Sequence, residues 1–210
     1  MEVLGATIID AWEKSIVHLL RKGDRVPTQR GMNALELQNV LFLIAAPADS
    51  MQISGAYPFS EGFIQMYTES LSSSYKGVSI KDRLYNYEGR FDQIKNVVRI
   101  LKKDPSSRRA TVSLWNVESD HKSTHPPCMV TMQFYIRDSK LHLTAVLRSN
   151  DAWMAAVPDM LSAVKIQIEV AGKLKVPVGS YNHLATSYHI YETDIVEAER
   201  VFQTRLNERE

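Results

Sequence analysis

The stretch "MVTMQFYIRDSKLHLTAVLR", residues 129–148, contains two segments in which apolar and polar side chains alternate. Alternation with a period of two is typical of β-strands that bury one face. The segments 129–137 and 140–148 are joined by the polar turn "RDSK" at residues 137–140. The stretch therefore predicts an antiparallel hairpin, and the sheet built on this hairpin decides the fold.

The rest of the chain predicts helices and strands in an irregular order. Apolar residues at helical spacing predict the helices, and alternating or continuous apolar runs predict the strands. The predicted helices are 6–21, 60–71, 92–103, 152–172 and the tail from 193, and the further strands are 35–47, 110–117 and 178–191. Because helices and strands do not alternate regularly, we expect the α+β class, with a mixed or antiparallel sheet flanked by helices. The long loops 72–91 and 117–127 are the expected places for functional residues.

Length and composition are those of an ordinary soluble globular protein. With 44% apolar and 23% charged residues, residues 1–210 are expected to form one domain with a substantial core. The net charge of +1 gives no general attraction to nucleic acid or to acidic membranes. There is no signal-peptide pattern and no apolar run that approaches the roughly 18 residues of a membrane span. A single cysteine cannot form an intrachain disulfide, which favours the cytoplasm, and the six histidines and this cysteine show no metal-ligand spacing.

The only cysteine, Cys128, comes directly before the hairpin in "THPPCMV", residues 124–130. Free cysteine is among the most buried residue types, so Cys128 taken alone favours a small buried apolar residue. A reactive cysteine needs partial exposure and nearby cations that stabilise its thiolate. Both interpretations stay open at this level.

Three further polar groups occur around the hairpin, and each has a structural and a functional interpretation. Arg108 and Arg109, in "DPSSRR", form a solvated corner or a phosphate clamp, because guanidinium offers paired donors to phosphate oxygens. The segment 148–151, "RSND", caps a helix or supplies a cation, a hydroxyl and an amide to a phosphorylated small molecule. His189 and Tyr191 lie two apart on a predicted strand and so share a face, where they serve the structure or bind a sugar hydroxyl.

Taken in order, these motifs resemble the thymidylate synthase and pyrimidine hydroxymethylase superfamily. The resemblance is carried by "DPSSRR", by "PPC" before "QFYIRDSKLHL", by "RSND" and by "HIY", with consistent spacing through residues 104–192. The earlier part of the chain matches only loosely, through "RGMNALEL" and "DQI". The resemblance implies a thymidylate-synthase-like fold in which a face of the sheet forms a homodimer.

The resemblance also implies a role for each matching residue around the phosphate of a pyrimidine nucleoside monophosphate. Cys128 falls on the nucleophile that attacks C6 of the pyrimidine. Arg148 and Ser149 fall on groups that hold the nucleotide 5′-phosphate. Arg108 and Arg109 fall on an arginine pair that is donated across the dimer interface to that same phosphate.

The sugar and cofactor contacts are assigned by the same resemblance. His189 and Tyr191 fall on the pair that binds the sugar 3′-hydroxyl. Asp151 falls on a carboxylate that contacts the pterin of 5,10-methylenetetrahydrofolate, the implied one-carbon donor. Asn150, within "RSND", and Arg30, in "QRGMNALEL", are expected to add substrate contacts.

Asp159, in "AAVPDML", is the informative departure, because thymidylate synthases carry an asparagine here that pairs with uracil. Cytosine presents an N3 acceptor and an N4 amino donor, and a carboxyl group can accept from N4 and, when protonated, donate to N3. Asp159 is thus similar to the residue of the deoxycytidylate hydroxymethylases, although it could also cap a helix. We expect 5-hydroxymethylation of dCMP, with CMP as the second choice and water ending the reaction. The alternatives are a thymidylate synthase or dUMP hydroxymethylase, and a homologue that binds nucleotide without catalysis.

Other positions depart from the family pattern as well. Met129 follows Cys128, where thymidylate synthases usually have histidine. The tyrosine that assists removal of the C5 proton is expected near residues 78–82, but "VSIKD" contains none, and Tyr85 or Tyr87 could replace it only with a shift. For the glutamate that organises water and the base, we choose Glu69, with Glu61 as the runner-up.

Overall fold

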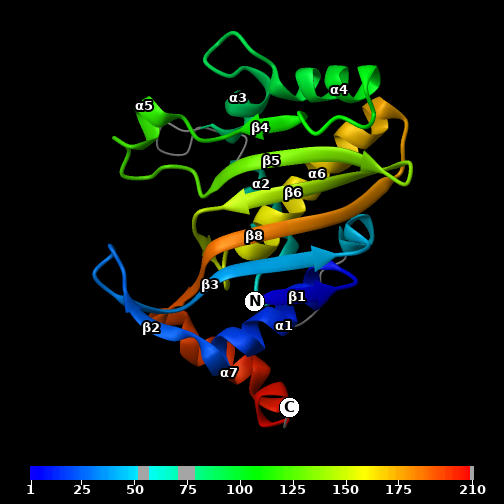
Figure 1. The fold of residues 1–210 in the computed structure, drawn as a ribbon. Coiled ribbons are helices and arrows are strands. Elements are labelled where there is room, and N and C mark those ends of the chain that lie inside the picture. Colours follow the sequence, from blue (N-terminus) through cyan, green and yellow to red (C-terminus); the bar gives the residue numbers. More distant parts are fainter. Residues whose placement is uncertain (52–56, 71–78, 209–210) are drawn as a thin grey trace.

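A mixed sheet forms the middle layer of the computed structural model, which describes residues 1–51, 57–70 and 79–208. Within these ranges eight strands follow the order β1-β3-β8-β6-β5-β4, with β2 paired to β3 and β7 paired to β8, and Figure 1 shows β4 and β1 at opposite edges. The strands are β1 (Glu2–Gly5), β2 (Asp24–Pro27), β3 (Asn33–Ile44), β4 (Thr111–Ser113), β5 (Met129–Arg137), β6 (Lys140–Leu147), β7 (Asn150–Asp151) and β8 (Val178–Tyr191). The helices are α1 (Ile8–Lys22), α2 (Glu61–Ser70), α3 (Ile80–Tyr85), α4 (Gln93–Lys103), α5 (Val117–Asp120), α6 (Ala156–Leu174) and α7 (Glu192–Asn207), with a 3₁₀ turn, η1, at Pro47–Met51.

The hairpin that the sequence predicts is formed by β5 and β6. The two strands pair antiparallel, with Arg137 opposite Lys140 at the turn. Asp138 and Ser139 take positive φ angles of 49° and 59°, as a two-residue turn that matches the twist of the strands requires. Strand β6 buries every second side chain, as predicted, whereas β5 does so only from Met132 to Phe134, after an irregularity between Met129 and Thr131.

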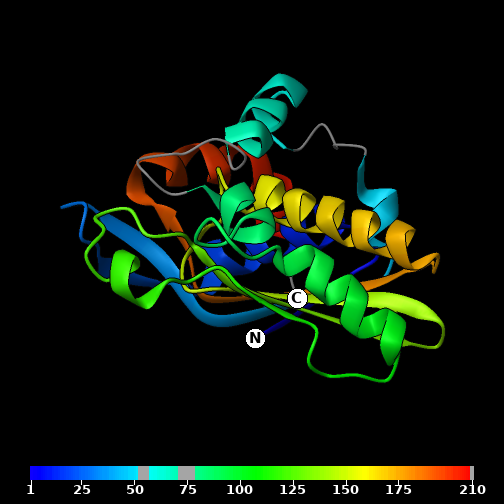
Figure 2. The same cartoon turned by 90° about the horizontal axis from the view of Figure 1, so that it is seen from above.

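Strand β8 makes the sheet mixed, because it pairs antiparallel with β3 and parallel with β6 and β7. A parallel neighbour needs a long crossover, and α6 supplies it between β6 and β8. Helices α1, α6 and α7 lie on one face of the sheet (Figure 2), and their buried apolar side chains form the core with the inward-facing residues of the strands. The predicted α+β class with a mixed sheet flanked by helices is therefore confirmed.

Three predicted segments differ from the structure. The strand predicted for 110–117 is shorter, since β4 ends at Ser113, and the predicted loop 117–127 begins with α5, which Asn116 caps by accepting from the amide of Ser119. The predicted loop 72–91 contains α3, which is capped by Ser79 and tied down by Arg83, while its residues 72–78 fall outside the described ranges. Within the described ranges, no helix combines the length and apolar character needed to cross a bilayer.

Candidate active site

Most of the residues singled out by their motifs, with the exception of Arg108 and Arg109, gather at one end of the sheet, on the left in Figure 1. Cys128 immediately precedes β5, and Arg148 immediately follows β6. Because β5 and β6 are antiparallel neighbours, the backbone amide of Arg148 donates to the carbonyl of Cys128 at 2.9 Å. The end of β8 and the start of β3 lie at the same end, with Tyr191 opposite Ala34. Strand order and direction thus bring together residues that are far apart in the sequence.

Arg148 fixes the proline loop that carries the thiol. Its Nε donates to the carbonyl of Pro127 at 3.0 Å, and its Nη2 donates to the carbonyl of Pro126 at 2.9 Å. The guanidinium is therefore held close to Cys128, whose residue surface is exposed. Both features that a reactive cysteine needs, a nearby cation and access, are present.

The pKa of the Cys128 thiol is raised from 9.0 to about 11. Desolvation by the surrounding atoms is the main cause and the negative charge of Asp159 adds to it, while Arg148 and Arg30 act in the opposite direction. The charge of Asp151 raises the pKa of the thiol as well, so two carboxylates disfavour the thiolate and two guanidinium groups favour it.

Asp159 lies in the first turn of α6 and is buried, with 6% of its surface exposed. Its Oδ1 accepts from the hydroxyl of Tyr67 on α2 at 3.1 Å, and its Oδ2 accepts from the amide of Asn150 on β7 at 2.9 Å. Burial raises the pKa of Asp159 to about 7, the charge of Asp151 adds to this rise, and the two hydrogen bonds oppose it. Near neutral pH this carboxyl group is therefore both a donor and an acceptor.

Asn150 connects Asp159 by hydrogen bonds to two further buried polar residues. The other amide atom of Asn150, Oδ1, lies 3.0 Å from Nε2 of His183, and Nδ1 of His183 lies 2.8 Å from the hydroxyl of Tyr181. Asn150, His183 and Tyr181 are all buried. Direct contact between Asn150 and a substrate stays a prediction, but in this structure both ends of its amide group contact protein atoms.

The predicted sugar-binding pair lies at the end of β8. The rings of His189 and Tyr191 pack edge to face, with their centres 4.9 Å apart. The Arg30 guanidinium lies 4.7 Å from the centre of the Tyr191 ring. Burial lowers the pKa of His189, which favours the neutral ring that can exchange hydrogen bonds with a hydroxyl. Ser187 connects this pair to Glu36, because its hydroxyl donates to Glu36 and lies 3.5 Å from Nδ1 of His189.

Ser149 and Asp151 flank Asn150 at the same edge. Both are half-buried, and Asp151 Oδ1 accepts from the backbone amides of Trp153 and Met154 at 3.0 Å each. The backbone of Asp151 pairs with His189, which places its carboxyl group between the sugar-binding pair and the start of α6.

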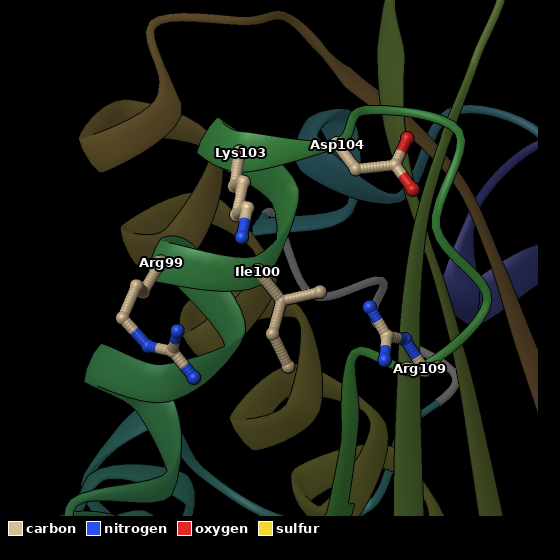
Figure 3. A pocket seen from close by; sticks show the side chains of 5 residues that line it. All are labelled: Arg99, Ile100, Lys103, Asp104 and Arg109. Atoms are coloured by element: carbon tan, nitrogen blue, oxygen red, sulfur yellow. The ribbon is translucent and has the colours of Figure 1, made fainter.

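Arg108 and Arg109 lie elsewhere, on the turn between α4 and β4. Arg109 lines a shallow pocket with Arg99, Ile100, Lys103 and Asp104, and Figure 3 shows the three cationic side chains around it. The pairing of β4 with β5 aligns this turn with the middle of β5, roughly 20 Å along the strand from Cys128. The structure therefore does not bring the arginine pair to Cys128 within one protomer.

The two candidate glutamates on α2 do not face the Tyr67–Asp159 contact. Glu69 is two residues, or about 200° of helix rotation, beyond Tyr67, and its exposed side chain accepts from Gln65. Glu61 is exposed at the start of the helix. The role of a base-organising glutamate thus remains a prediction without a contact in this structure.

The candidate tyrosines and Met129 are also placed away from the thiol chemistry. Tyr85 donates to Glu169 on α6 at 2.5 Å, and Tyr87 accepts from Asn116. Met129 is buried among core residues at the start of β5. Sequence reasoning missed Tyr67, whose only signal was an aromatic at helical spacing from Phe63, and it missed His183, which is fully buried on β8 and contacts Phe42.

Comparison with known proteins gives one consistent result. A family model described as "Thymidylate synthase" matches residues 49–209. A protein of Methanosarcina mazei named "Putative thymidylate synthase" is 32% identical over 89% of this chain and 88% of its own length. Proteins with the same name from Methanocaldococcus jannaschii and Methanothermobacter thermautotrophicus are each 30% identical. The first alignment covers 88% of both chains, and the second covers 93% of this chain and 96% of that protein.

Proposed function

Because this chain belongs to the thymidylate synthase family, whose members transfer one-carbon units to nucleotides, we propose that it 5-hydroxymethylates a cytidine nucleotide. The substrate is dCMP, with CMP as the second choice. The one-carbon donor is 5,10-methylenetetrahydrofolate, and water completes the product.

The observation that carries this proposal is the state of Asp159. An asparagine amide suits uracil, whereas Asp159 offers a carboxyl group whose pKa of about 7 allows one oxygen to accept and the other to donate near neutral pH. That arrangement matches the N4 amino donor and the N3 acceptor of cytosine. A good bidentate pair is worth about 1–3 kcal/mol of discrimination between bases.

The residues around the thiol divide the chemistry between them. Cys128 Sγ forms a bond to C6 of the base, which makes C5 a carbon nucleophile. Arg148 lies beside the thiol and favours its ionised form. Arg148, Ser149 and Arg30 hold the phosphate, and His189 and Tyr191 hold the sugar, so that C6 stays at attack distance.

The residues present also fit a folate. Asp151 supplies a half-buried carboxylate that can accept from the N–H groups of a pterin ring. When bound, 5,10-methylenetetrahydrofolate supplies the one-carbon unit that C5 takes up. Asp151 orients the ring, and Cys128 is released when the product is complete.

We further propose that the functional unit is a homodimer, in which Arg108 and Arg109 serve the phosphate site of the partner. Their distance from Cys128 within one protomer supports this assignment. The sheet face opposite α1, α6 and α7 is the proposed interface, with half-buried side chains such as Tyr135, His142 and Asn182. Mixing an Arg109→Ala chain with a Cys128→Ala chain should restore activity at one site of each mixed dimer, whereas no restoration would exclude sharing across the interface.

The substrate is tested by incubating the protein with dCMP, CMP or dUMP, each with formaldehyde and tetrahydrofolate. We expect dCMP to gain the mass of one CH₂O unit, read by mass spectrometry. A gain of one CH₂ unit on dUMP without product from dCMP would instead identify a thymidylate synthase, which the names of the relatives favour. A dUMP product that gains CH₂O would identify a dUMP hydroxymethylase.

A homologue that only binds nucleotide is the remaining alternative, since the described residues near Ile80 do not supply the family tyrosine. Release of tritium from C5-labelled dCMP separates the two, because exchange requires addition of the thiolate at C6. Release above that of a Cys128→Ala control supports catalysis, and equal release supports binding alone.

A further inference from the structure

The hydrogen bonds around Asp159 have directions that the chemistry of the partners fixes. Asn150 donates through its amide nitrogen to Asp159 Oδ2, so its oxygen faces His183 and needs a donor there. Nε2 of His183 must therefore carry a proton. Burial lowers the pKa of His183 to about 3, so the ring is neutral, Nδ1 is an acceptor, and the hydroxyl of Tyr181 donates to it. Every donor in this buried row points toward Asp159.

The two oxygens of Asp159 consequently meet different partners. Oδ2 accepts from the amide N–H of Asn150, at one end of the buried row. Oδ1 accepts from the hydroxyl of Tyr67 on α2. Because each carboxylate oxygen has two lone-pair sites, each is held by one protein donor and keeps a second site for a base.

We propose that Tyr67 is a positioning residue that, together with the row Tyr181–His183–Asn150, fixes the orientation of the Asp159 carboxyl group in front of the base. This inference rests on the proposed function and deepens it, since it explains how the base-reading carboxyl group is held in one arrangement. Tyr67 and His183 thereby contribute to base discrimination through Asp159, without touching the substrate.

Other titratable groups surround this carboxyl and must be considered in any test of its protonation. They are Asp151 on β7, Tyr57 ahead of α2, Tyr181 on β8 and Cys128 ahead of β5. A Tyr67→Phe substitution leaves all of them in place and removes a single oxygen atom, while the ring keeps its contact with Phe63.

The test compares Tyr67→Phe with Tyr85→Phe. Tyr85 is the matched control, because its hydroxyl also donates to a carboxylate, that of Glu169, ten residues or about 15 Å further along α6 than Asp159. Nucleotide binding is measured by calorimetry from pH 5 to pH 9 with dCMP and with dUMP. The affinity is plotted against pH, and the titration midpoint that is absent from the curve of Asp159→Asn is assigned to Asp159.

In Tyr67→Phe the Asp159 midpoint should move to higher pH, because a hydrogen bond that favours the ionised form is lost. The ratio of affinities for the two bases should also fall by about tenfold, the effect of one hydrogen bond to a charged group. Tyr85→Phe should change neither quantity. An unchanged midpoint and ratio in Tyr67→Phe would overturn the inference, even if the variant melts at a lower temperature. The preference of the wild-type protein for dCMP or dUMP tests the proposed function separately, because the shift in midpoint is expected with whichever base binds better.

Discussion

Replacing Asp159 with asparagine should make the protein more stable at alkaline pH. The amide has the shape of the carboxyl group, its oxygen can accept from Asn150, and its nitrogen can donate to a rotated Tyr67 hydroxyl. The hydrogen-bond count is therefore kept, and the main change is the loss of a buried charge. Because that charge is disfavoured in the folded state, its removal should raise the free energy of unfolding.

The size of the effect follows from the pKa of Asp159, which rises from 3.8 to about 7 on folding. A folded-state value above the unfolded one means that the unfolded chain loses its proton first, so stability falls as pH rises from about 4 and levels off above pH 7. At 1.36 kcal/mol per pH unit, the full cost is about 4 kcal/mol. Between pH 5 and pH 8 the gap between variant and wild type should widen by about 2.5 kcal/mol.

Thermal unfolding followed by circular dichroism at pH 5 and pH 8 measures this gap. For a chain of this length, about 2.5 kcal/mol corresponds to a change of roughly 5–10 °C in the difference between the two melting temperatures. Asp24→Asn, an exposed position on β2, is the control and should show the same difference at both pH values. A constant gap between Asp159→Asn and wild type would refute the reasoning, since it would mean that Asp159 ionises as readily in the folded protein as in the unfolded chain.

Three further results are expected. Asp159→Asn should react faster at Cys128 with iodoacetamide at pH 7, because the carboxylate charge raises the pKa of the thiol, and a rate at or below that of wild type would contradict this coupling. Asp120→Ala should lower the free energy of unfolding in urea by about 3–5 kcal/mol, because Arg83, with a side chain only 12% exposed, loses both contacts to the carboxylate; a loss under about 1 kcal/mol would show that Arg83 finds water instead. Lys175→Gly should raise stability by about 1 kcal/mol in the same assay, since Lys175 ends α6 with φ 59° and ψ 41°, and a decrease would mean that its side chain contributes more than the backbone strain costs.

Much of the fold could be predicted, because side-chain periodicity acts over a few residues. The hairpin at 129–148 and the strand at 178–191 were predicted at nearly their observed bounds, since buried and less buried side chains alternate along β6 and along the first half of β8. Helix α3 was not predicted. It has six residues, and the tertiary bond between Arg83 and Asp120, rather than a local pattern, holds it in place.

The site was predicted less completely, because some of its residues are close together in the sequence and others are brought together only by the fold. Cys128 and Arg148 follow from adjacent strand ends, and the motif that joins them is local to one hairpin. Tyr67 contacts Asp159 across 92 positions of sequence, and nothing in α2 itself distinguishes this tyrosine from a core aromatic. Asn150 was placed in the site by its polar motif, and the structure adds what the motif could not show, that its amide group contacts Asp159 and His183.

The exposed position of Cys128, the only thiol of the chain, determines how this protein reacts with oxidants. The thiolate is the nucleophile that attacks an oxygen atom of peroxide, so a raised pKa slows formation of the sulfenic acid. Once formed, that acid has no second cysteine in the same chain with which to condense into a disulfide. Recovery must come from a thiol outside the chain, such as glutathione, and further oxidation to the sulfinic acid would inactivate the site permanently.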